Sequence, residues 1–544
     1  MGTYFNPDNQ GFRTDIQSRI YIDKTGLISY TNSVLCTSER CIALSHARRF
    51  GKSQAATMLK AYYSRGCDSE ELFSGFEISK SPDFRKHLNQ YNVIHFDVSS
   101  FSDDFGTGLI KEIKRHIYDE FREEYPEIDY SKSTAAVLMQ VYKKSVVRTE
   151  NAEKNIPFVI IIDEWDCVIR NYPDKPEFIH EYLQFLHSLF KSDESKTFLA
   201  LGYITGIVPI KKIKDESALN NFDEYTMTDS GVLTEYFGFT EDEVIELCSK
   251  YDMNFDSVKA WYNGYLISGE HMYNPNSVYM AMVRHSLESY WKNTSAFETL
   301  NTFIALNLDG LREDVMKMLS GEKVYVDVKG FENDLSNINN KDDALTALIH
   351  LGYLGYDKNE RSAYIPNYEV KEAYQSALSK GKWSEISKSI SRCEELLFST
   401  MRGDAEKVAQ LLELSHETYT SVQKYNDENS LSCAITMAYF TAPAYYTVIR
   451  ELASGKGFAD MVFIPRSDSP NKPAMIIELK WDKDADTAIR QIKEKRYAGN
   501  LKGYGKEVLL VGVNYDKRTK KHECVIETVK NGMPIFDLKE IKPE

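Results

Sequence analysis

The chain lacks several features that would place it in a special class of protein. No apolar run in its 544 residues approaches the length of a membrane-spanning helix, and its N-terminus is polar, so we expect neither a membrane anchor nor a signal peptide. Its eight cysteines include no C-x-x-C pair and no cluster with histidine, which argues against a zinc site or a disulfide framework. This cysteine usage suits a reducing cytoplasm, where we expect the protein to act.

An excess of positive charge is also missing. The formal net charge is -15, so any contact with nucleic acid would depend on local basic patches. The densest basic cluster is Lys517, Arg518, Lys520 and Lys521, which indicates either a solvated hairpin tip or a patch that contacts phosphates. The length exceeds what one hydrophobic core organises and predicts about three or four domains.

One stretch near the N-terminus has the pattern of a phosphate-binding loop. Residues 41–45 are a short apolar run of strand type, and a helical pattern begins at Ser53 after the sequence Phe50-Gly51-Lys52-Ser53. A strand that turns sharply into a helix presents unpaired amide groups to phosphate oxygens, while Lys52 would add charge and Ser53 could ligate Mg²⁺. The usual motif has glycine where this chain has His46. A plain solvent loop is the alternative interpretation of the G-K-S tripeptide.

A second motif lies about a hundred residues further along. Residues 157–162 are apolar at every position, as in a strand buried on both faces, and Asp163 and Glu164 follow directly. This is the Walker B arrangement, in which Asp163 would hold Mg²⁺ opposite Ser53 and Glu164 would polarise the attacking water. Carboxylates at a strand end are also common helix caps, but the pairing with a phosphate loop favours the nucleotide site.

The segments around these motifs alternate between strand and helix patterns. Strands are expected over 91–98 and 198–204, and helices over 108–125 and 134–148, which predicts a parallel sheet with helices on both faces. Thr205 directly follows the second of these strands. It could sense the γ-phosphate, or it could be an ordinary cap or turn residue.

Beyond residue 236 the pattern is mainly helical. Helices are expected over 241–251, 255–261, 276–290, 297–306, 309–319, 342–351, from 370, and over 383–398 and 404–414, with short strands over 352–356 and 361–365. A helix followed by a short hairpin is compatible with a winged-helix-like lid.

A third constellation lies near the C-terminus. Asp460 precedes a predicted strand over 461–464, and Glu478 and Lys480 lie in the apolar run 474–480, with another strand expected over 507–513. Side chains two apart on a strand share a face, about 6 to 7 Å apart, so Glu478 and Lys480 point together towards the strand after Asp460. Two facing carboxylates attract a hard divalent cation, and an adjacent lysine can act on a water. Surface ion pairs give the same pattern.

The motifs follow one another as in the prokaryotic AAA-ATPase-like family. The matching segments are Y-I-D-K-T at 21–25, R-R-F-G-K-S at 48–53, I-I-D-E-W-D at 161–166, I-T-G-I at 204–207, Y-F-G-F at 236–239 and W-Y-N-G-Y at 261–265. The resemblance implies that ATP and Mg²⁺ are held by Arg49, Phe50, Gly51, Lys52, Ser53, Gln54, Asp163 and Thr205. His46 and Ala47 stand where that family usually has arginine and proline.

Members of this family are commonly fused to a PD-(D/E)XK nuclease-like domain, and the C-terminal constellation resembles its D…ExK layout. The resemblance implies that Asp460 and Glu478 hold a metal and that Lys480 acts on water, with Gln491 and Tyr497 in the Q-x-x-x-x-x-Y pattern beside the site. Glu428 resembles the upstream acid of that fold. Where tyrosine and histidine typically follow that acid, the chain has Leu431 and Ser432.

Together these observations predict an α/β protein with three parts. They are a P-loop NTPase core over 1–232, a helical, winged-helix-like lid over 233–380 and a PD-(D/E)XK-type nuclease-like domain over 381–544. The expected activity is ATP hydrolysis, with Glu164 as base, together with Mg²⁺- or Mn²⁺-dependent cleavage of DNA or RNA. Two alternatives stay open: a nucleotide-dependent switch whose nuclease-like domain binds without cutting, and a decayed remnant of a mobile element. The sequence also leaves an oligomer open.

Overall fold

The structure is a computed structural model of the chain. It describes all residues except 1, 105–107, 150–151, 211–218, 291–299, 301, 304–305, 307, 309, 320, 330, 332–337, 381–383, 421–430, 432–434, 437, 440, 443–444, 455–456, 466–471, 496–506 and 531–544. The chain divides into two compact units: unit 1 comprises Met1–Val258, Tyr262–Tyr290 and Val324–Pro366, and unit 2 comprises Lys259–Trp261, Trp291–Lys323 and Asn367–Glu544. The finer three-part division at residues 232 and 380 stays a prediction.

Unit 1 is built on a parallel sheet of five strands in the order β2-β5-β6-β1-β7. The strands are β1 (Cys41–Ser45), β2 (Asn92–Asp97), β5 (Phe158–Asp163), β6 (Leu199–Gly206) and β7 (Asp223–Thr226). The expected doubly covered parallel sheet is confirmed. Its first four strands in space were predicted with nearly these bounds, whereas the short polar β7 was not.

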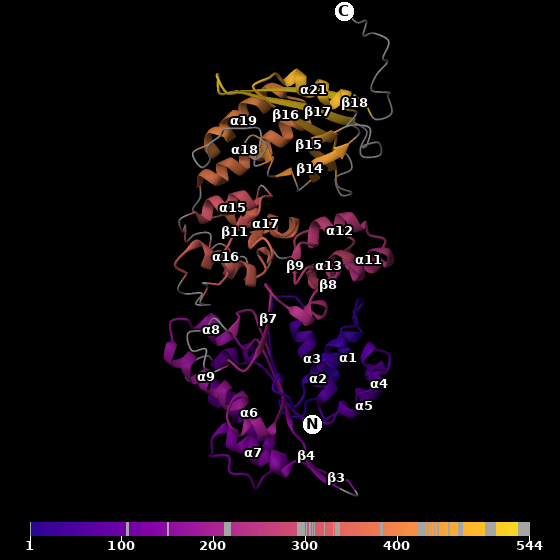
Figure 1. The fold of residues 1–544 in the computed structure, drawn as a ribbon, viewed down its shortest axis with the longest axis vertical. Coiled ribbons are helices and arrows are strands. Elements are labelled where there is room, and N and C mark those ends of the chain that lie inside the picture. Colours follow the sequence, from indigo (N-terminus) through magenta and orange to yellow (C-terminus); the bar gives the residue numbers. More distant parts are fainter. Residues whose placement is uncertain are drawn as a thin grey trace, which may run out of the picture. The chain divides into compact units, whose positions relative to one another are not determined.

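Helices cover both faces of this sheet. They are α1 (Gln10–Ile16), α2 (Gly26–Val34), α3 (Lys52–Tyr63), α4 (Glu70–Phe73), α5 (Phe84–His87), α6 (Leu109–Glu124), α7 (Thr134–Lys144), α8 (Cys167–Asn171), α9 (Pro176–Phe190) and α10 (Ser195–Phe198). Side chains alternate along the strands: Ile160 and Ile162 of β5 pack with α6, α7 and α9, whereas Val159 and Ile161 pack with α2 and α3. The two helical groups flank the sheet in Figure 1. Burial on both faces explains why β5 is apolar at every position from Phe158 to Ile162.

One expected helix is too long. The helical pattern over 134–148 ends at Lys144, and residues 146–149 form β3 (Val146–Thr149), which pairs with β4 (Ala152–Asn155) in an antiparallel hairpin. The β-branched run Val146-Val147 favours a strand, which is the reason the helix does not continue. Similarly, the helix expected over 276–290 is α13 (Pro275–Arg284), because His285 adopts a left-handed conformation that ends it.

The rest of unit 1 contains two small antiparallel sheets and their helices. The first sheet comprises β8 (Phe239–Thr240), β10 (Glu270–Tyr273) and β9 (Tyr265–Ile267), and the second comprises β11 (Val324–Tyr325), β13 (Ser362–Tyr364) and β12 (Gly355–Asp357). The α-helices described there are α11 (Glu241–Lys250), α13 and α16 (Lys341–His350), while α12 (Phe255–Tyr262) is divided between the two units. A hairpin, β12–β13, does follow α16, but its role as a lid stays a prediction. Most of the helix expected over 297–306 lies outside the described residues.

Unit 2 contains a five-stranded mixed sheet in the order β14-β15-β16-β17-β18. The strands are β14 (Tyr446–Ser454), β15 (Gly457–Pro465), β16 (Ala474–Trp481), β17 (Glu507–Asp516) and β18 (Lys521–Lys530), and the helices of the unit are α15 (Leu311–Leu319), α17 (Tyr368–Lys380), α18 (Ser384–Met401), α19 (Ala405–Thr420) and α21 (Ala485–Glu494). Only β16 and β17 are parallel, with α21 as their crossover. The sequence did not indicate β14, and it indicated β18 only through the hairpin-tip interpretation of the basic cluster.

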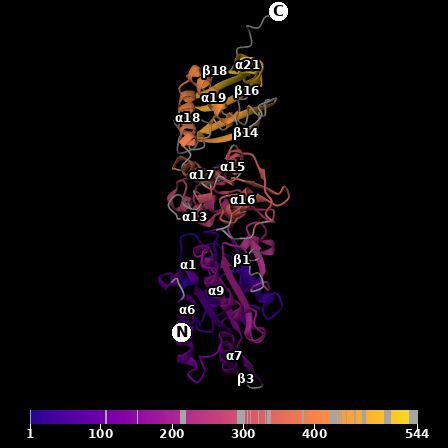
Figure 2. The ribbon, with the colours of Figure 1, turned by 90° about the vertical axis from the view of Figure 1, so that its left-hand side faces the viewer.

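The two faces of this sheet differ in what covers them. Met475, Ile477 and Leu479 of β16 pack in the core that includes α18 and α19, whereas Ala474 and Ile476 pack with Ile489 of α21. Figure 2 shows α18 and α21 on different sides of the strands. Even-numbered β16 residues therefore face α21, and Glu478 and Lys480 belong to that set.

No helix in the described part of the chain is long and apolar enough to cross a membrane. The seven cysteines that the structure describes are free thiols. The cytoplasmic location stays a prediction.

Candidate functional site: a phosphate loop with a Walker B pair, and a carboxylate–lysine cluster

The loop between β1 and α3 has the geometry of a phosphate-binding loop. Gly51 is the N-cap of α3 and has a φ of 88°, a conformation that favours glycine. The first amide groups of α3 have no carbonyl partner within the helix and are directed at the loop. Gly51 thereby lets the chain turn directly from the loop into a helix end suited to an anion.

A cavity of about 470 Å³ opens at this loop. Its walls include all six residues predicted to hold the nucleotide there, namely Arg49, Phe50, Gly51, Lys52, Ser53 and Gln54, and also Glu164. Ser53 and Gln54 are exposed to it, whereas Lys52 is only 5% exposed. The site therefore unites the two motifs that the sequence placed a hundred residues apart.

Lys52 is held close to its own loop. Its Nζ donates to the carbonyl oxygens of His46 and Ala47, both at 2.9 Å. Burial lowers the pKa of Lys52, and the charges of Glu164 and Asp163 oppose that shift. The ammonium group thus lies within electrostatic range of the Walker B acids, as the nucleotide site requires.

Asp163, the last residue of β5, is not among the residues that line the cavity. It is 5% exposed, and its Oδ1 accepts hydrogen bonds from the Thr205 hydroxyl and, at 3.0 Å, from the amide of Glu164. The neighbouring strand places Asp97 beside Asp163. Burial raises the pKa of Asp97, hydrogen bonds from Ser99 oppose this shift, and the Asp163 charge adds to it. Thr205 contacts Asp163 directly, but its action as a phosphate sensor stays a prediction.

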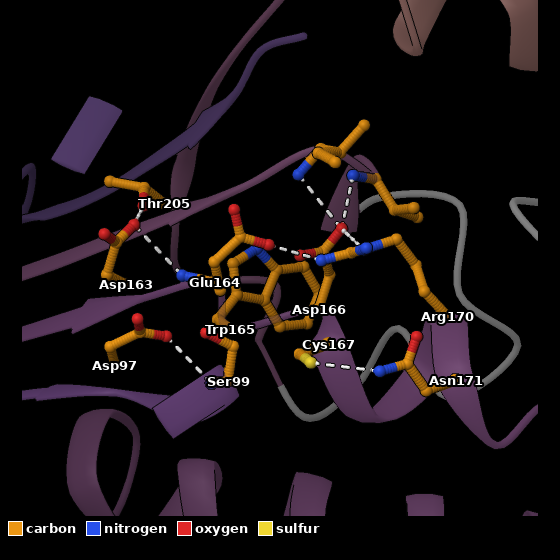
Figure 3. A network of polar contacts seen from close by, with 12 residues as sticks. Asp97, Ser99, Asp163, Glu164, Trp165, Asp166, Cys167, Arg170, Asn171 and Thr205 are labelled. Carbon is orange, nitrogen blue, oxygen red and sulfur yellow. Dashed lines mark hydrogen bonds and ion pairs between the residues drawn. The ribbon is translucent and has the colours of Figure 1, made fainter. Parts of the chain in front are cut away.

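Glu164 belongs to a network of buried charges (Figure 3). Its Oε2 pairs with Arg170 Nη2, and Arg170 Nε lies 2.9 Å from Asp166 Oδ2. Burial and then the Asp166 charge raise the pKa of Glu164, and Arg170 and Lys52 oppose this. Sequence reasoning missed Arg170; the third acid in D-E-W-D, Asp166, was the only signal of a larger cluster.

His46, the departure from the glycine of the usual motif, is fully buried. Its Nε2 lies 2.6 Å from Ser230 Oγ, which itself donates to Thr226 O. The Ser230 hydroxyl therefore accepts from the imidazole, so that Nε2 carries the hydrogen and Nδ1, which has no hydrogen-bond partner, does not. Burial and the Lys52 charge lower the pKa of His46 to about 3, so the ring is neutral beside the phosphate loop.

In unit 2, the predicted nuclease residues converge on the α21 face of the sheet. Lys480 Nζ lies 3.1 Å from Glu478 Oε1, which also accepts from Gln491 Nε2 of α21. The ladder between β15 and β16 ends at Met461–Ile477, and Asp460 Oδ2 instead accepts from the Leu479 amide at 2.7 Å. The regular pairing of β15 with β16 therefore stops where Asp460 and Glu478 are neighbours.

The electrostatics of this cluster suit a bound cation. Glu478 is 1% exposed and its Oε2 has no hydrogen-bond partner. Burial, with the Asp460 charge adding to it, raises the pKa of Glu478 to about 7 despite Lys480. A buried carboxylate oxygen without a donor, beside a second carboxylate, fits a hard divalent cation. No group of three or more acid, histidine or cysteine ligands is found in the described residues.

Several further predicted positions can be checked. Glu428, Ser432 and Tyr497 lie outside the described residues, and Leu431 packs in the core of unit 2. The basic cluster lies at the turn between β17 and β18, as the hairpin-tip interpretation predicts. Contact of this turn with phosphates stays a prediction.

Comparison with known proteins defines the class of each region. Residues 10–214 match the family model described as predicted AAA-ATPase, and residues 426–524 match the PD-(D/E)XK nuclease superfamily. The two matches lie in the order that the sequence predicted, which confirms the expected architecture. A curated relative, described as an uncharacterized protein in the vnfD 5' region of Azotobacter chroococcum mcd 1, is 23% identical over 526 residues, which cover 92% of this chain and 93% of the relative.

Proposed function

We propose that unit 1 binds and hydrolyses ATP. The observation that carries this proposal is that Lys52, Ser53 and Glu164 line one cavity at the start of α3. The helix amides and Lys52 would bind the phosphates, Ser53 and Asp163 would hold Mg²⁺, and Glu164 would accept the proton of the attacking water. Bound Mg²⁺ would neutralise charge on the phosphate oxygens.

The test is ATP hydrolysis by the full chain with Glu164→Gln and Lys52→Ala. Glu164→Gln should bind ATP and lose at least about a hundredfold in turnover, because a general base contributes that much. Lys52→Ala should weaken binding itself. Wild-type turnover no faster than that of Glu164→Gln would contradict the proposal.

We further propose that unit 2 cleaves phosphodiester bonds with Mg²⁺ or Mn²⁺. The supporting observation is the buried Glu478 oxygen that lacks a donor beside Asp460, with Lys480 and Gln491 on the other oxygen. Asp460 and Glu478 would hold the cation, which supplies a nucleophilic water at neutral pH, while Lys480 orients that water and Gln491 orients Glu478.

The rival is a nucleotide-dependent switch whose nuclease-like unit binds without cutting. The replacement of the usual loop glycine by His46 favours it, since His46 fills the base of the loop with a buried ring. The assay that separates the two uses the purified full chain with Mn²⁺, with and without ATP, on single-stranded DNA, duplex DNA and RNA. Cleavage that Asp460→Ala abolishes supports the nuclease; wild-type cleavage equal to that of Asp460→Ala, with binding retained, supports the switch.

A further inference from the structure

Arg170 connects two carboxylates at the end of β5 that have different surroundings. Glu164 lines the cavity and is partly exposed, whereas Asp166 is fully buried. The Arg170 side chain is only 10% exposed. Its Nη2 contacts the Glu164 carboxylate and its Nε contacts the Asp166 carboxylate. Since a guanidinium presents its donors in a rigid planar fork, fixing one carboxylate fixes the direction of the other contact.

Asp166 is itself held in place by hydrogen bonds and therefore fixes the guanidinium of Arg170. Besides Arg170, its Oδ2 accepts the amide hydrogens of Ile207 at 3.0 Å and Val208 at 2.8 Å. These two residues follow directly after β6, the strand that carries Thr205. Figure 3 shows the resulting chain of contacts from Glu164 through Arg170 and Asp166 to that segment. Moving Asp166 would break three charge-assisted hydrogen bonds in a buried site.

We propose that Arg170 is a positioning residue for Glu164. Its guanidinium, fixed by Asp166, holds the Glu164 carboxylate at the cavity wall and ties it to the segment after β6, so that the base and Thr205 keep a constant relation. This role rests on the proposed ATP hydrolysis. It assigns to a short helix, α8, a part in organising the reaction that the motif residues alone do not provide.

The test measures kcat and KM for ATP in steady-state hydrolysis by the full chain, for wild type, Arg170→Gln and Arg170→Lys. For Arg170→Gln we expect a roughly 10- to 100-fold lower kcat and a KM for ATP near that of wild type. Arg170→Lys keeps the charge but not the fork, so it should restore only part of kcat. Arg85→Gln, which removes an exposed pair with Glu70, is the matched control and should behave as wild type.

Each result decides the matter. If wild type hydrolyses ATP and Arg170→Gln has the same kcat or a higher one, the positioning role is wrong and the proposed hydrolysis stands. If wild type shows no turnover, the proposed hydrolysis fails and this role fails with it. Thermal denaturation checks that the variants fold; should Arg170→Gln not fold, unchanged kcat in both Arg170→Lys and Asp166→Asn would overturn the role.

Discussion

Lys480 and Glu478 form an ion pair of 3.1 Å inside unit 2, with side chains only 7% and 2% exposed. A buried pair recovers its desolvation cost only if all its polar atoms are satisfied, and Glu478 Oε2 is not. The pair is therefore poorly suited to stabilise the fold. It is well suited to a function in which a cation supplies the missing contact.

The first prediction concerns stability against pH without metal. The pKa of Glu478 is raised from 4.5 to about 7, so the folded protein keeps this proton to a higher pH than the unfolded chain does. The free energy of unfolding should therefore fall as pH rises from about 4.5 to about 7, by about 3 kcal/mol in total. Glu478→Gln removes this dependence, which thermal denaturation in EDTA across this range would measure.

The prediction is tested by how the difference in unfolding free energy between wild type and Glu478→Gln changes with pH. The size of this difference at a single pH does not test it, because the variant also deprives Lys480 of its partner at every pH. Glu523→Gln makes the same substitution at an exposed position of β18 and serves as the control. If the unfolding free energies of wild type and Glu478→Gln change with pH in parallel, Glu478 is not held in its protonated form.

The second prediction concerns the hydroxyl of Thr205. Thr205→Val keeps the shape of the side chain but removes the hydroxyl that donates to Asp163 Oδ1. The Glu164 amide then remains as a donor to that oxygen. We expect kcat for ATP to fall about tenfold or more with little change in affinity, and stability to fall by about 1 to 3 kcal/mol. Steady-state kinetics and calorimetric ATP binding would measure this.

Thr31→Val is the matched control for Thr205→Val. It removes a buried hydroxyl bonded to Tyr63 at 2.7 Å, away from the cavity residues. It should lower stability to a similar extent and leave kcat unchanged. An equal loss of kcat in both variants would mean that Thr205 acts through stability alone.

The third prediction uses the space at Gly206, the last residue of β6. A Cβ there would lie 2.7 Å from Trp165 Nε1 and 2.8 Å from Asp166 Oδ1, both fully buried atoms without hydrogen-bond partners. Gly206→Ala should therefore displace Asp166, lower stability by about 1 to 3 kcal/mol and reduce ATP turnover. Gly75→Ala, where a Cβ meets nothing within 4 Å, is the control; equal thermal stability of the two variants would contradict the expected clash.

Much of the architecture could be predicted because its signals are local. The apolar run of β5 and the apolar run of β16 before Glu478 report burial directly, and the turn at Gly51 needs a residue type that the sequence displays. The strands that were missed have no such signal: β7 reads D-E-Y-T, and β14 carries charged residues among its apolar ones. Their pairing is decided by the neighbouring strand.

The network around Arg170 shows a second limit. Arg170 lies on a short helix and resembles any solvated arginine in the sequence. Its partner Asp166 becomes a fixed support only through amides of residues 207 and 208, which follow a different strand. These contacts form because the ends of β5 and β6 are neighbours in the folded sheet. Neither Asp166 nor residues 207 and 208 carry a signal of that proximity in the sequence.

The last prediction concerns His46, which stands where the family usually has arginine. Its neutral ring is fully buried, with Ser230 as partner and the Lys52 charge nearby. His46→Arg would place a permanent cation at this buried position without a carboxylate contact. The cation would lie near the Lys52 ammonium group, which donates to two loop carbonyl oxygens. We expect a loss of about 3 to 5 kcal/mol in stability, as for an unpaired buried charge, and weaker ATP binding, because the loop must open to hydrate the guanidinium. His271→Arg, at an exposed position of β10, is the control. A His46→Arg protein as stable as this control would mean that the site accommodates the family's arginine, and that His46 is a neutral replacement and not a fixed element of this loop.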